Sequence, residues 1–386
     1  MTSATQQKVQ RSLPTPEAEA LLELTREIAA AELAPRAATA EESGEFPRDV
    51  FRTLGRSGLL GLPYPEAYGG GGQPHEVYLQ VLEELARAWL TVGVGVGVHT
   101  LASFPLATYG TEAQRERWLP GIVGGDVLGA YCLSEPQSGS DAASLRTRAI
   151  PKGDEYVLSG TKAWTTHAGV ADFYTLFART SDDGAQGISC LRVPADTPGL
   201  SAAPPEHKMG MKASPTGQMI FDDARVPADH LLGERGEGFA AALAALASGR
   251  LGIAACAVGL AQAVMDAAVE YARERRQFGR PIIDFEGVSF ILADMATGIE
   301  AARALYLEAA RSKDAGRAYE PQAAMAKLFA SDTAMRVATD GVQVLGGYGY
   351  VADYPLERYM REAKVLQIVE GTNQIQRLVI GRHLAS

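Results

Sequence analysis

Four short segments combine residue types that can bind a polar ligand or move a proton. Residues 131–141, YCLSEPQSGSD, pass from an apolar run into a loop rich in hydroxyl groups, glycine and proline. Such a loop exposes backbone N–H groups and short donors, which suit a phosphate or the polar edge of a cofactor. Residues 162–167, KAWTTH, place a tryptophan beside two threonine hydroxyls, which suits a flat ring system with hydrogen-bonding heteroatoms. Taken singly, these segments are also compatible with an ordinary turn and a core tryptophan.

The other two segments carry charge. Residues 271–281, YARERRQFGRP, end in a cluster of arginines, and arginine suits bidentate recognition of phosphate. Cations that offset a helix dipole explain part of this cluster without a ligand. Residues 367–376, QIVEGTNQIQ, place Glu370 after an apolar run and before a new helix. A carboxylate in apolar surroundings has a raised pKa and can act as a general base, although Glu370 by itself could simply precede a capped helix.

Hydrophobic periodicity divides the elements around these segments into three zones. Apolar residues recur at three- and four-residue spacings over 17–33 and 78–90, which predicts helices in the first zone. Four consecutive glycines, 69–72, predict a loop between helical segments. The β-prone runs of the middle zone are 155–159, 173–178, 188–193 and 219–221. The long helical segments of the last zone are 237–275, 286–315 and 320–345.

This order predicts an α+β fold and excludes the alternating strands and helices of a Rossmann sheet. We predict an N-terminal helical domain over residues 15–127, a middle β domain over 128–236 and a C-terminal helical bundle over 237–386. Residues 239–264 are apolar enough to be compared with a membrane span. Arg250 at the middle of this stretch and its high alanine content favour a buried core helix.

Composition excludes several classes of protein. The chain has 386 residues, of which 46% are hydrophobic and 21% charged, and these values are typical of globular proteins. A net charge of −10 argues against binding to nucleic acid.

Cys132, Cys190 and Cys256 are too far apart for a disulfide framework or a zinc site, and the histidines show no metal-ligand spacing. Residues 1–14 lack an apolar signal core, so we expect a cytoplasmic protein with no metal and no membrane partner.

Together and in this order, the segments resemble the acyl-CoA dehydrogenase family. The motifs that carry the resemblance are YCLSEPQSGSD, KAWTTHA, GMKASPTGQMIFDDARVP, YARERRQFGRPI, QVLGGYGY and QIVEGTNQIQR. They extend over nearly the whole chain, from about residue 16 to residue 383. The resemblance implies an N-terminal helical domain, a small β-barrel or sandwich domain and a C-terminal four-helix bundle. It also implies FAD held between the middle and C-terminal domains, and a homo-oligomer that is usually a tetramer.

The resemblance implies a reaction as well. Glu370 matches the catalytic base, which removes the α-proton of an acyl-CoA thioester while the β-hydrogen leaves as hydride to flavin N5. The product is the trans-2-enoyl-CoA, and the electrons pass on to an electron-transfer flavoprotein. Trp164 is implied to stack near the flavin ring and Thr166 to bond toward N5. These expectations place the enzyme in fatty acid metabolism, in β-oxidation.

Further binding roles follow from the same positions. The residues implied along the flavin or the CoA arm are Tyr131, Leu133, Ser134 and Ser140. The residues implied to reach the FAD of a neighbouring subunit, or its pyrophosphate and adenine side, are Arg275, Gln277, Phe278, Gln343 and Gly347. Thr372 and Gln374 are implied to help hold FAD. The residues implied to contact the substrate are Ser140, Gly93, Gly97, Arg250 and Gly371.

Departures from the family pattern refine these expectations. Some members carry their base just before the arginine matched by Arg250, but residue 249 is glycine here, which leaves Glu370 as the one candidate. Residues 91–104 contain no arginine or lysine, so we do not expect a dicarboxylyl substrate. Gly93, Gly95 and Gly97 predict either a roomy pocket floor for a long or branched acyl chain or a close contact between helices.

Two other functions remain open. An acyl-CoA oxidase would pass its electrons to oxygen, although the peroxisomal-type oxidases usually carry an extra C-terminal domain. A non-enzymatic subunit could keep the fold without the activity. The intact Glu370 and the intact flavin segments argue against this last interpretation.

Overall fold

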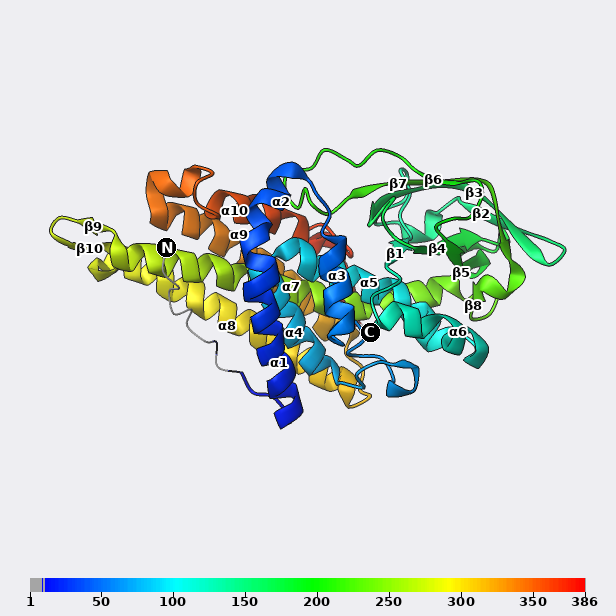
Figure 1. Cartoon of the computed structure of the whole chain (residues 1–386), viewed down its shortest axis with the longest axis horizontal. Helices are drawn as coiled ribbons and strands as arrows, with labels where there is room; N and C mark the ends of the chain where they lie inside the picture. The colour runs from blue at the N-terminus through cyan, green and yellow to red at the C-terminus, as the bar shows by residue number, and fades with distance from the viewer. Residues whose placement is uncertain (1–8, 10, 386) are drawn as a thin grey trace. The chain divides into compact units, whose positions relative to one another are not determined.

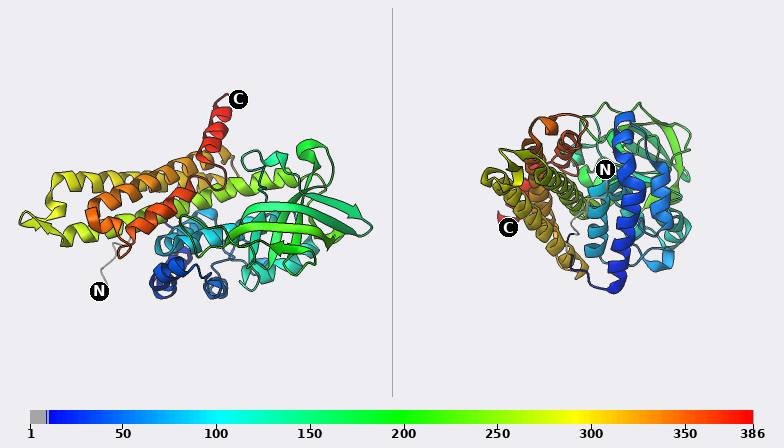
Figure 2. Two further views of the ribbon diagram at one scale, coloured as in Figure 1. Left: turned by 90° about the horizontal axis from the view of Figure 1, so that it is seen from above. Right: turned by 60° about the vertical axis from the view of Figure 1, so that its left-hand side comes forward.

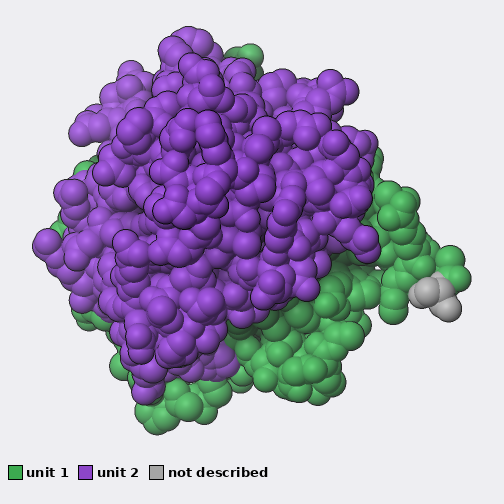
Figure 3. All heavy atoms as spheres, turned by 90° about the vertical axis from the view of Figure 1, so that its right-hand side faces the viewer, with its two compact units in different colours: residues 1–38, 75–93, 250–386 green, residues 39–74, 94–249 purple. Residues whose placement is uncertain are grey.

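The computed structural model describes residue 9 and residues 11–385, and it divides into two compact units (Figures 1 and 3). The first, which we call the helical unit, comprises Met1–Ala38, His75–Gly93 and Arg250–Ser386. The second, which we call the mixed unit, comprises Thr39–Pro74 and Val94–Gly249. Each unit is therefore built from stretches that are distant in the sequence.

The elements follow the order that periodicity predicts. The α-helices are α1 (Pro16–Ile28), α2 (Ala34–Ser43), α3 (Arg48–Arg56), α4 (His75–Ala88), α5 (Leu90–Tyr109), α6 (Glu112–Val123), α7 (Gly238–Glu274), α8 (Glu286–Asp314), α9 (Glu320–Leu345), α10 (Leu356–Leu366) and α11 (Asn373–Ala385). The strands are β1 (Gly129–Cys132), β2 (Arg148–Lys152), β3 (Glu155–Thr166), β4 (Phe173–Arg179), β5 (Ile188–Pro194), β6 (Leu200–Ala202), β7 (Thr216–Pro227), β8 (Leu231–Leu232), β9 (Arg276–Gln277) and β10 (Arg280–Pro281). The predicted α+β fold is confirmed, whereas the division into three domains at the stated residues stays a prediction.

The mixed unit is built on one sheet with the strand order β6-β7-β3-β2-β4-β5-β8, with β1 beside β4. Strands β1 and β2 run parallel to β4, and the other pairs are antiparallel. Alternate side chains of β4 enter two different cores: Phe173 and Phe177 pack with residues of α5 and α6, while Tyr174 and Leu176 pack with the other strands. Because β4 is buried on both faces, it reads in the sequence as a continuous apolar run.

One irregularity in this sheet positions a predicted site residue. Strands β3 and β7 pair from Glu155 opposite Pro227 to Thr166 opposite Thr216, and their register shifts between Lys162 and Thr165. Such a bulge bends the strand and re-aims a side chain. Trp164 lies in this irregular stretch with a φ of 58°, and 65% of its surface is exposed.

The helical unit is a bundle in which α9 packs along α8, α10 and α11 (Figures 1 and 2). The last helix, α11, contacts α9, and its C-terminal end points away from the bundle (Figure 2). Small residues let α7 approach α4 closely: a Cβ built on Gly259 would lie 2.3 Å from the backbone oxygen of Glu83. The ten residues from Leu251 to Leu260 of α7 are all buried.

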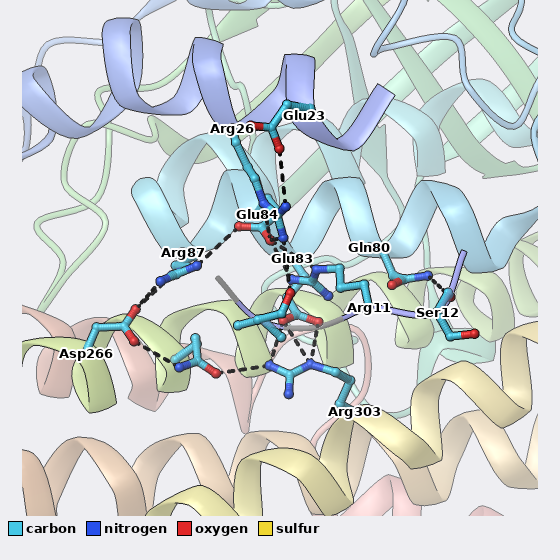
Figure 4. A network of polar contacts seen from close by, with 12 residues as sticks. Arg11, Ser12, Glu23, Arg26, Gln80, Glu83, Glu84, Arg87, Asp266 and Arg303 are labelled. Carbon is cyan, nitrogen blue, oxygen red and sulfur yellow. Dashed lines mark hydrogen bonds and ion pairs between the residues drawn. The ribbon is translucent and has the colours of Figure 1, made fainter. Parts of the chain in front are cut away.

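Glu83 lies at the centre of a buried polar network in this unit (Figure 4). Its carboxylate pairs with Arg11 and with Arg303 of α8, both at 2.9 Å, and accepts a hydrogen bond of 2.5 Å from the hydroxyl of Tyr306. Burial alone would raise the pKa of Glu83, but the two guanidinium groups lower it to about 2. The network therefore joins α4, α8 and the segment before α1 through a charge that stays ionised.

Two described helices, α5 and α7, are long and apolar enough to cross a membrane by length and composition. In their most hydrophobic windows, 78% and 72% of the residues are buried inside the protein. Helices that pack against their own chain in this way need no lipid to cover them, which favours the core-helix interpretation of residues 239–264.

Candidate active site

The mixed unit presents Trp164 and Thr166 beside the loop that follows β1. The backbone N–H of Ala163 donates to the carbonyl of Ser134 at 2.8 Å, which ties this loop to the strand that carries Trp164. Thr165 points the opposite way into the core, where its hydroxyl lies 3.6 Å from Cys132 Sγ. An exposed indole next to a partly exposed threonine is the flat wall with a polar edge that the sequence predicts.

A buried ion pair holds the same loop. Lys162 Nζ lies 2.9 Å from Glu135 Oε1, and the two side chains are 0% and 2% exposed. The Glu135 carboxylate also accepts hydrogen bonds from the backbone N–H groups of Arg146 and Thr147. Burial would raise the pKa of Glu135, but the Lys162 ammonium and these donors lower it to about 2. The loop is thus fastened to β3 by a charged pair, one residue away from Ser134.

The other predicted residues of this loop are placed differently. The Leu133 side chain is buried in the core. Tyr131 is half-buried, packs against Phe177 with ring centroids 5.0 Å apart and donates its hydroxyl to the carbonyl of Ala242 at 3.3 Å. Ser140 is exposed. Of these four positions, Leu133 is buried, Tyr131 and Ser134 are half-buried and Ser140 is exposed.

In the helical unit, Glu370 lies in the turn between α10 and α11 with a φ of 51°. Its Oε2 atom is buried and has no hydrogen-bond partner among the described residues. Burial raises the pKa of Glu370 to about 7, against the opposing charges of Lys327 and Arg250. A carboxyl group with a pKa near 7 and a bare oxygen has the properties of a general base.

Arg250 and Glu370 form one electrostatic group in this unit. The Arg250 side chain on α7 is buried, its Nε has no hydrogen-bond partner among the described residues, and burial lowers its pKa against the charge of Glu370. A buried guanidinium nitrogen without a hydrogen-bond acceptor destabilises the folded state unless a ligand supplies the acceptor. Arg250 therefore lies near the candidate base, and the substrate contacts expected of Arg250 and Gly371 stay a prediction.

The arginine motif forms an exposed hairpin at the end of α7. Strands β9 and β10 pair, and Phe278 at their turn is 94% exposed with a φ of 50°. The Arg275 guanidinium lies 5.7 Å from the ring centroid of Tyr348, so the hairpin base lies beside the segment that carries Gln343 and Gly347. Gln277, Gln343 and Gly347 are exposed.

Two further predicted residues begin α11. The Thr372 hydroxyl accepts a hydrogen bond from the Ile375 N–H at 3.3 Å, as the first residue of a capped helix does. Thr372 and exposed Gln374 line a shallow cavity of about 300 Å³ together with Lys364, Gln367 and Arg377. The structure thus places the predicted residues in three groups. One lies in the mixed unit around Trp164. The helical unit holds the other two, one around Glu370 and Arg250 and one at the arginine hairpin, which begins 25 residues after Arg250 at the far end of α7.

The glycine-rich stretch of α5 is tightly packed at its first two glycines. A Cβ on Gly93 would lie 2.6 Å from the Ala86 Cβ on α4, and a Cβ on Gly95 would lie 2.6 Å from the Phe51 ring. These contacts support the alternative of close packing at both positions. Gly97 is half-buried, and its part in an acyl pocket stays a prediction.

Two residues near Glu370 were missed by the sequence analysis. Lys327 of α9 and Gln376 of α11 are fully buried, and both donate to the carbonyl of Gly371. A single lysine within the apolar run AAMAKLFA (323–330) was the available signal, because a charge on the buried face of a helix requires a partner.

Among the described residues, no cluster of histidine, cysteine or acidic side chains could hold a metal ion, and the three cysteines are free and buried.

Comparison with known proteins agrees with this geometry. The N-terminal, middle and C-terminal domain models of acyl-CoA dehydrogenase match residues 15–126, 130–224 and 236–385. An acyl-CoA dehydrogenase of Bacillus subtilis is 48% identical over 94% of this chain and 96% of its own length.

Two solved structures share the fold over nearly the whole chain. Butyryl-CoA dehydrogenase from Megasphaera elsdenii has a TM-score of 0.95 at 40% identity, covering 98% of this chain and 100% of that one. A chain from the structure of the electron transferring flavoprotein of Acidaminococcus fermentans also has a TM-score of 0.95, at 42% identity, covering 97% and 99%. Members of the matched family are FAD-dependent flavoproteins. The chain belongs to the acyl-CoA dehydrogenase family and is an FAD-dependent oxidoreductase.

Proposed function

We propose that this enzyme removes hydrogen from the α and β carbons of an acyl-CoA thioester to give the trans-2-enoyl-CoA, with Glu370 as the base that takes the α-proton. The observation that carries the proposal is the Glu370 carboxyl group, whose Oε2 atom is buried without a hydrogen-bond partner among the described residues and whose pKa is raised to about 7 by burial. A base with this pKa is half ionised near neutral pH and still strong enough to accept a proton from carbon in a polarised thioester.

The α-proton of a thioester is weakly acidic, so the negative charge that develops on the thioester oxygen must be stabilised. The Glu370 backbone N–H donates to no acceptor among the described residues, and we propose it as one donor to that oxygen. Arg250 adds a cation close to the same turn. The chain would therefore supply both the base and part of the electrostatic stabilisation from one short segment.

The residues present fit FAD. Trp164 and Phe278 are both largely exposed, and large exposed aromatic side chains mark surfaces that a ligand or a partner covers. Both residues also adopt a left-handed backbone, a strained conformation that is concentrated at functional sites. We propose that Trp164 and Thr166 contact the flavin ring, that Ser134 and Ser140 contact its polar arms, and that Thr372 and Gln374 help hold it. We propose that Arg275, Gln277 and Gln343 reach the pyrophosphate and adenine side of the FAD of a neighbouring subunit. FAD bound by these residues would supply the hydride acceptor for the β-hydrogen.

We infer that the enzyme transfers its electrons to an electron-transfer flavoprotein and assembles as a homotetramer in the cytoplasm. The similarity to a chain from an electron transferring flavoprotein structure supports the partner. The exposed Phe278 hairpin supports an assembly in which a second copy covers it. Light scattering of the purified protein tests the tetramer, and a monomer would contradict it.

The acyl chain is proposed to be long or branched, on the strength of the small side chain at Gly97. The similarity to a butyryl-CoA dehydrogenase makes a short chain the direct competitor. Turnover of an acyl-CoA series of increasing length decides between them, and a sharp optimum at four carbons would contradict the long-chain proposal.

The proposed reaction is tested by the visible spectrum of the flavin-loaded enzyme during anaerobic addition of an acyl-CoA panel. We expect at least one acyl-CoA to bleach the flavin in the native enzyme and none to do so in Glu370→Gln. Glu362→Gln is a matched control, because Glu362 is a fully buried glutamate on α10 that pairs with Arg358 at 3.4 Å. It should bleach as the native enzyme does. A flavin that no acyl-CoA bleaches would contradict the substrate class, and rapid oxygen consumption during turnover would favour the oxidase alternative.

A further inference from the structure

We propose that Lys327 is a positioning residue for Glu370, whose buried ammonium group holds the turn that carries the base. This inference rests on the proposed function of Glu370. It assigns a task to a side chain that contacts the backbone next to the base and does not itself touch substrate.

Lys327 is fixed on two sides. Its side chain is fully buried on α9, and its Nζ donates to the carbonyl of Gly371 at 2.9 Å and to Asn373 Oδ1 at 2.8 Å. The Asn373 amide in turn donates to Ser331 Oγ at 2.9 Å and to Asp332 Oδ1 at 2.7 Å. The ammonium group therefore links α9 to the turn before α11 through a chain of satisfied hydrogen bonds.

Gln376 holds the same turn from the other side. Its buried Nε2 donates to the carbonyl of Gly371 at 2.8 Å and to that of Glu370 at 3.3 Å. A Cβ on Gly371 would lie 2.8 Å from this nitrogen, and the φ of 88° at this position also favours glycine. Lys327 and Gln376 together bind the carbonyls of the two residues that define the direction of the Glu370 side chain.

The turn needs to be held because its backbone is strained. Glu370 and Gly371 have φ values of 51° and 88°, and the left-handed region is unfavourable for a glutamate. Such a conformation persists only where the surroundings over-determine it, and it is found where a side chain must point in one direction. Without the two donors, the turn would relax toward ordinary backbone angles and the carboxylate would move.

Lys327 also supplies charge. The charged and titratable groups that face Glu370 are Lys327 on α9, Arg250 on α7 and the thiol of Cys256 on α7, and Asp332 on α9 acts on Lys327. Burial lowers the pKa of Lys327 to about 8, while the charges of Glu370 and Asp332 raise it. At neutral pH the ammonium therefore opposes the effect of burial on Glu370 and keeps part of the base ionised.

Variants of Lys327 and Gln376 distinguish the effect of the turn's position on Glu370 from the effect of a nearby charge. Lys327→Met removes two hydrogen bonds and a positive charge, whereas Gln376→Met removes hydrogen bonds alone. Lys313→Met is the matched control, because Lys313 near the end of α8 is a partly buried lysine whose pKa burial likewise lowers to about 8.

Two measurements on the FAD-loaded enzyme test the proposal. The first is the exchange of α-hydrogen for deuterium in 3,3-dimethylbutyryl-CoA, followed by NMR over a range of pH. Its β-carbon bears no hydrogen, so this thioester reports proton removal alone. The second is an infrared titration of the Glu370 carboxyl group, taken as the difference between each protein and its Glu370→Gln counterpart.

Lys327→Met should slow exchange about 10- to 100-fold at its plateau, because a misplaced base loses much of its rate. It should also move the midpoint of both titrations upward by about one pH unit, because a nearby cation lowers the pKa of a carboxyl group. Gln376→Met should slow exchange without moving the midpoint, and Lys313→Met should change neither. If Lys327→Met does not fold, Lys327→Arg replaces it. The arginine keeps the positive charge, so the titration midpoint of Glu370 should not move. Its bulkier guanidinium cannot keep both hydrogen bonds, so exchange should slow.

The proposal would be overturned if Lys327→Met showed the same exchange rate and the same midpoints as the native enzyme. It would also be overturned if Lys327→Arg exchanged the α-hydrogen at the native rate. If Gln376→Met exchanged the α-hydrogen at the native rate, this would contradict the inference that Gln376 stabilises the turn together with Lys327. Exchange that persists in Glu370→Gln would instead refute the proposed function, whatever the lysine variants do.

Discussion

At the scale of single residues, the candidate base combines two unfavourable features. Glu370 is held in the left-handed region, and burial raises its pKa to about 7 although two cations lie near it. Each feature opposes folding, and the Oε2 atom has no hydrogen-bond partner among the described residues. Strain and desolvation that coincide on one carboxyl group are typical of sites where reactivity is maintained at the expense of stability.

We predict that turnover rises with pH along a limb centred near 7. Below this pH the Glu370 carboxyl is protonated and cannot accept the α-proton, and above it the carboxylate is free to act. Stopped-flow rates of flavin reduction between pH 5 and 9 measure this limb. In Glu370→Gln the rate should fall by about 10²- to 10⁴-fold and the limb should disappear. A limb centred near 4.5, the ordinary glutamate value, would show that the base is solvated.

At the scale of elements, irregular and closely packed stretches set the positions of the site residues. The register shift in β3 exposes Trp164, and the Glu135–Lys162 pair fastens the neighbouring loop to the same strand. Close contact between α7 and α4 depends on Gly259. Both arrangements are sensitive to substitutions that would be harmless elsewhere.

We expect Glu135→Gln to lower the free energy of unfolding by about 3–5 kcal/mol, because it leaves the Lys162 ammonium buried without a counter-ion. The exposed pair between Arg148 and Asp182, at 2.8 Å with side chains 50% and 80% exposed, provides the comparison. Asp182→Asn should cost less than about 1 kcal/mol. Urea unfolding of both variants measures the difference, and equal losses would contradict a structural role for the buried pair.

Gly259→Ala should destabilise the protein even though alanine is the better helix former. Its Cβ would lie 2.3 Å from the Glu83 carbonyl oxygen, and backbone cannot move aside cheaply. At Gly287 on α8 no atom lies within 4 Å of the added Cβ, so Gly287→Ala should be neutral or stabilise by up to about 1 kcal/mol. Thermal unfolding of the two variants tests this, and a Gly259→Ala protein as stable as the native one would mean that α7 shifts freely.

At the scale of the molecule, the helical unit is held together by contacts between residues far apart in the chain. Glu83 and Arg303 are 220 positions apart, and Arg11 lies 72 positions before Glu83 (Figure 4). A lowered carboxyl pKa stabilises the folded state above the unfolded value of 4.5, and this contribution is lost as the pH falls toward 2. The network is therefore a source of acid sensitivity.

We predict that Glu83→Gln lowers the free energy of unfolding at pH 7 by about 3–5 kcal/mol, since Arg11 and Arg303 lose their shared counter-ion. The difference from the native protein should shrink as the pH falls below 4.5. Glu300→Gln is the control, because Glu300 pairs with the same Arg303 but its side chain is 68% exposed. Denaturant unfolding at pH 7, 5 and 3.5 follows the difference, and a pH-independent loss would point to packing instead of charge.

The sequence by itself determined the class of fold, the order of its elements and the segments that carry chemistry. Helical and strand periodicity act over a few residues, so the extents of α8, α9, β4 and β5 follow from local patterns. Strands β3 and β7 extend well beyond the predicted runs 155–159 and 219–221, and β1, β2, β6 and β8 were not predicted. The same local information marked Glu370 and Trp164, because a carboxylate before a helix and a tryptophan beside hydroxyls are visible within ten residues.

Only the tertiary structure decided which side chains support the site. Lys327 and Glu370 are 43 positions apart, and the hydrogen bond from Lys327 to the carbonyl of Gly371 depends on how α9 packs against the turn before α11. The raised pKa of Glu370, the bulge at Trp164 and the close approach at Gly259 likewise depend on which distant groups exclude water or occupy space. Burial and long-range contacts are properties of the folded chain, because residues that are neighbours in space are often distant in the sequence. Local sequence patterns therefore do not predict them.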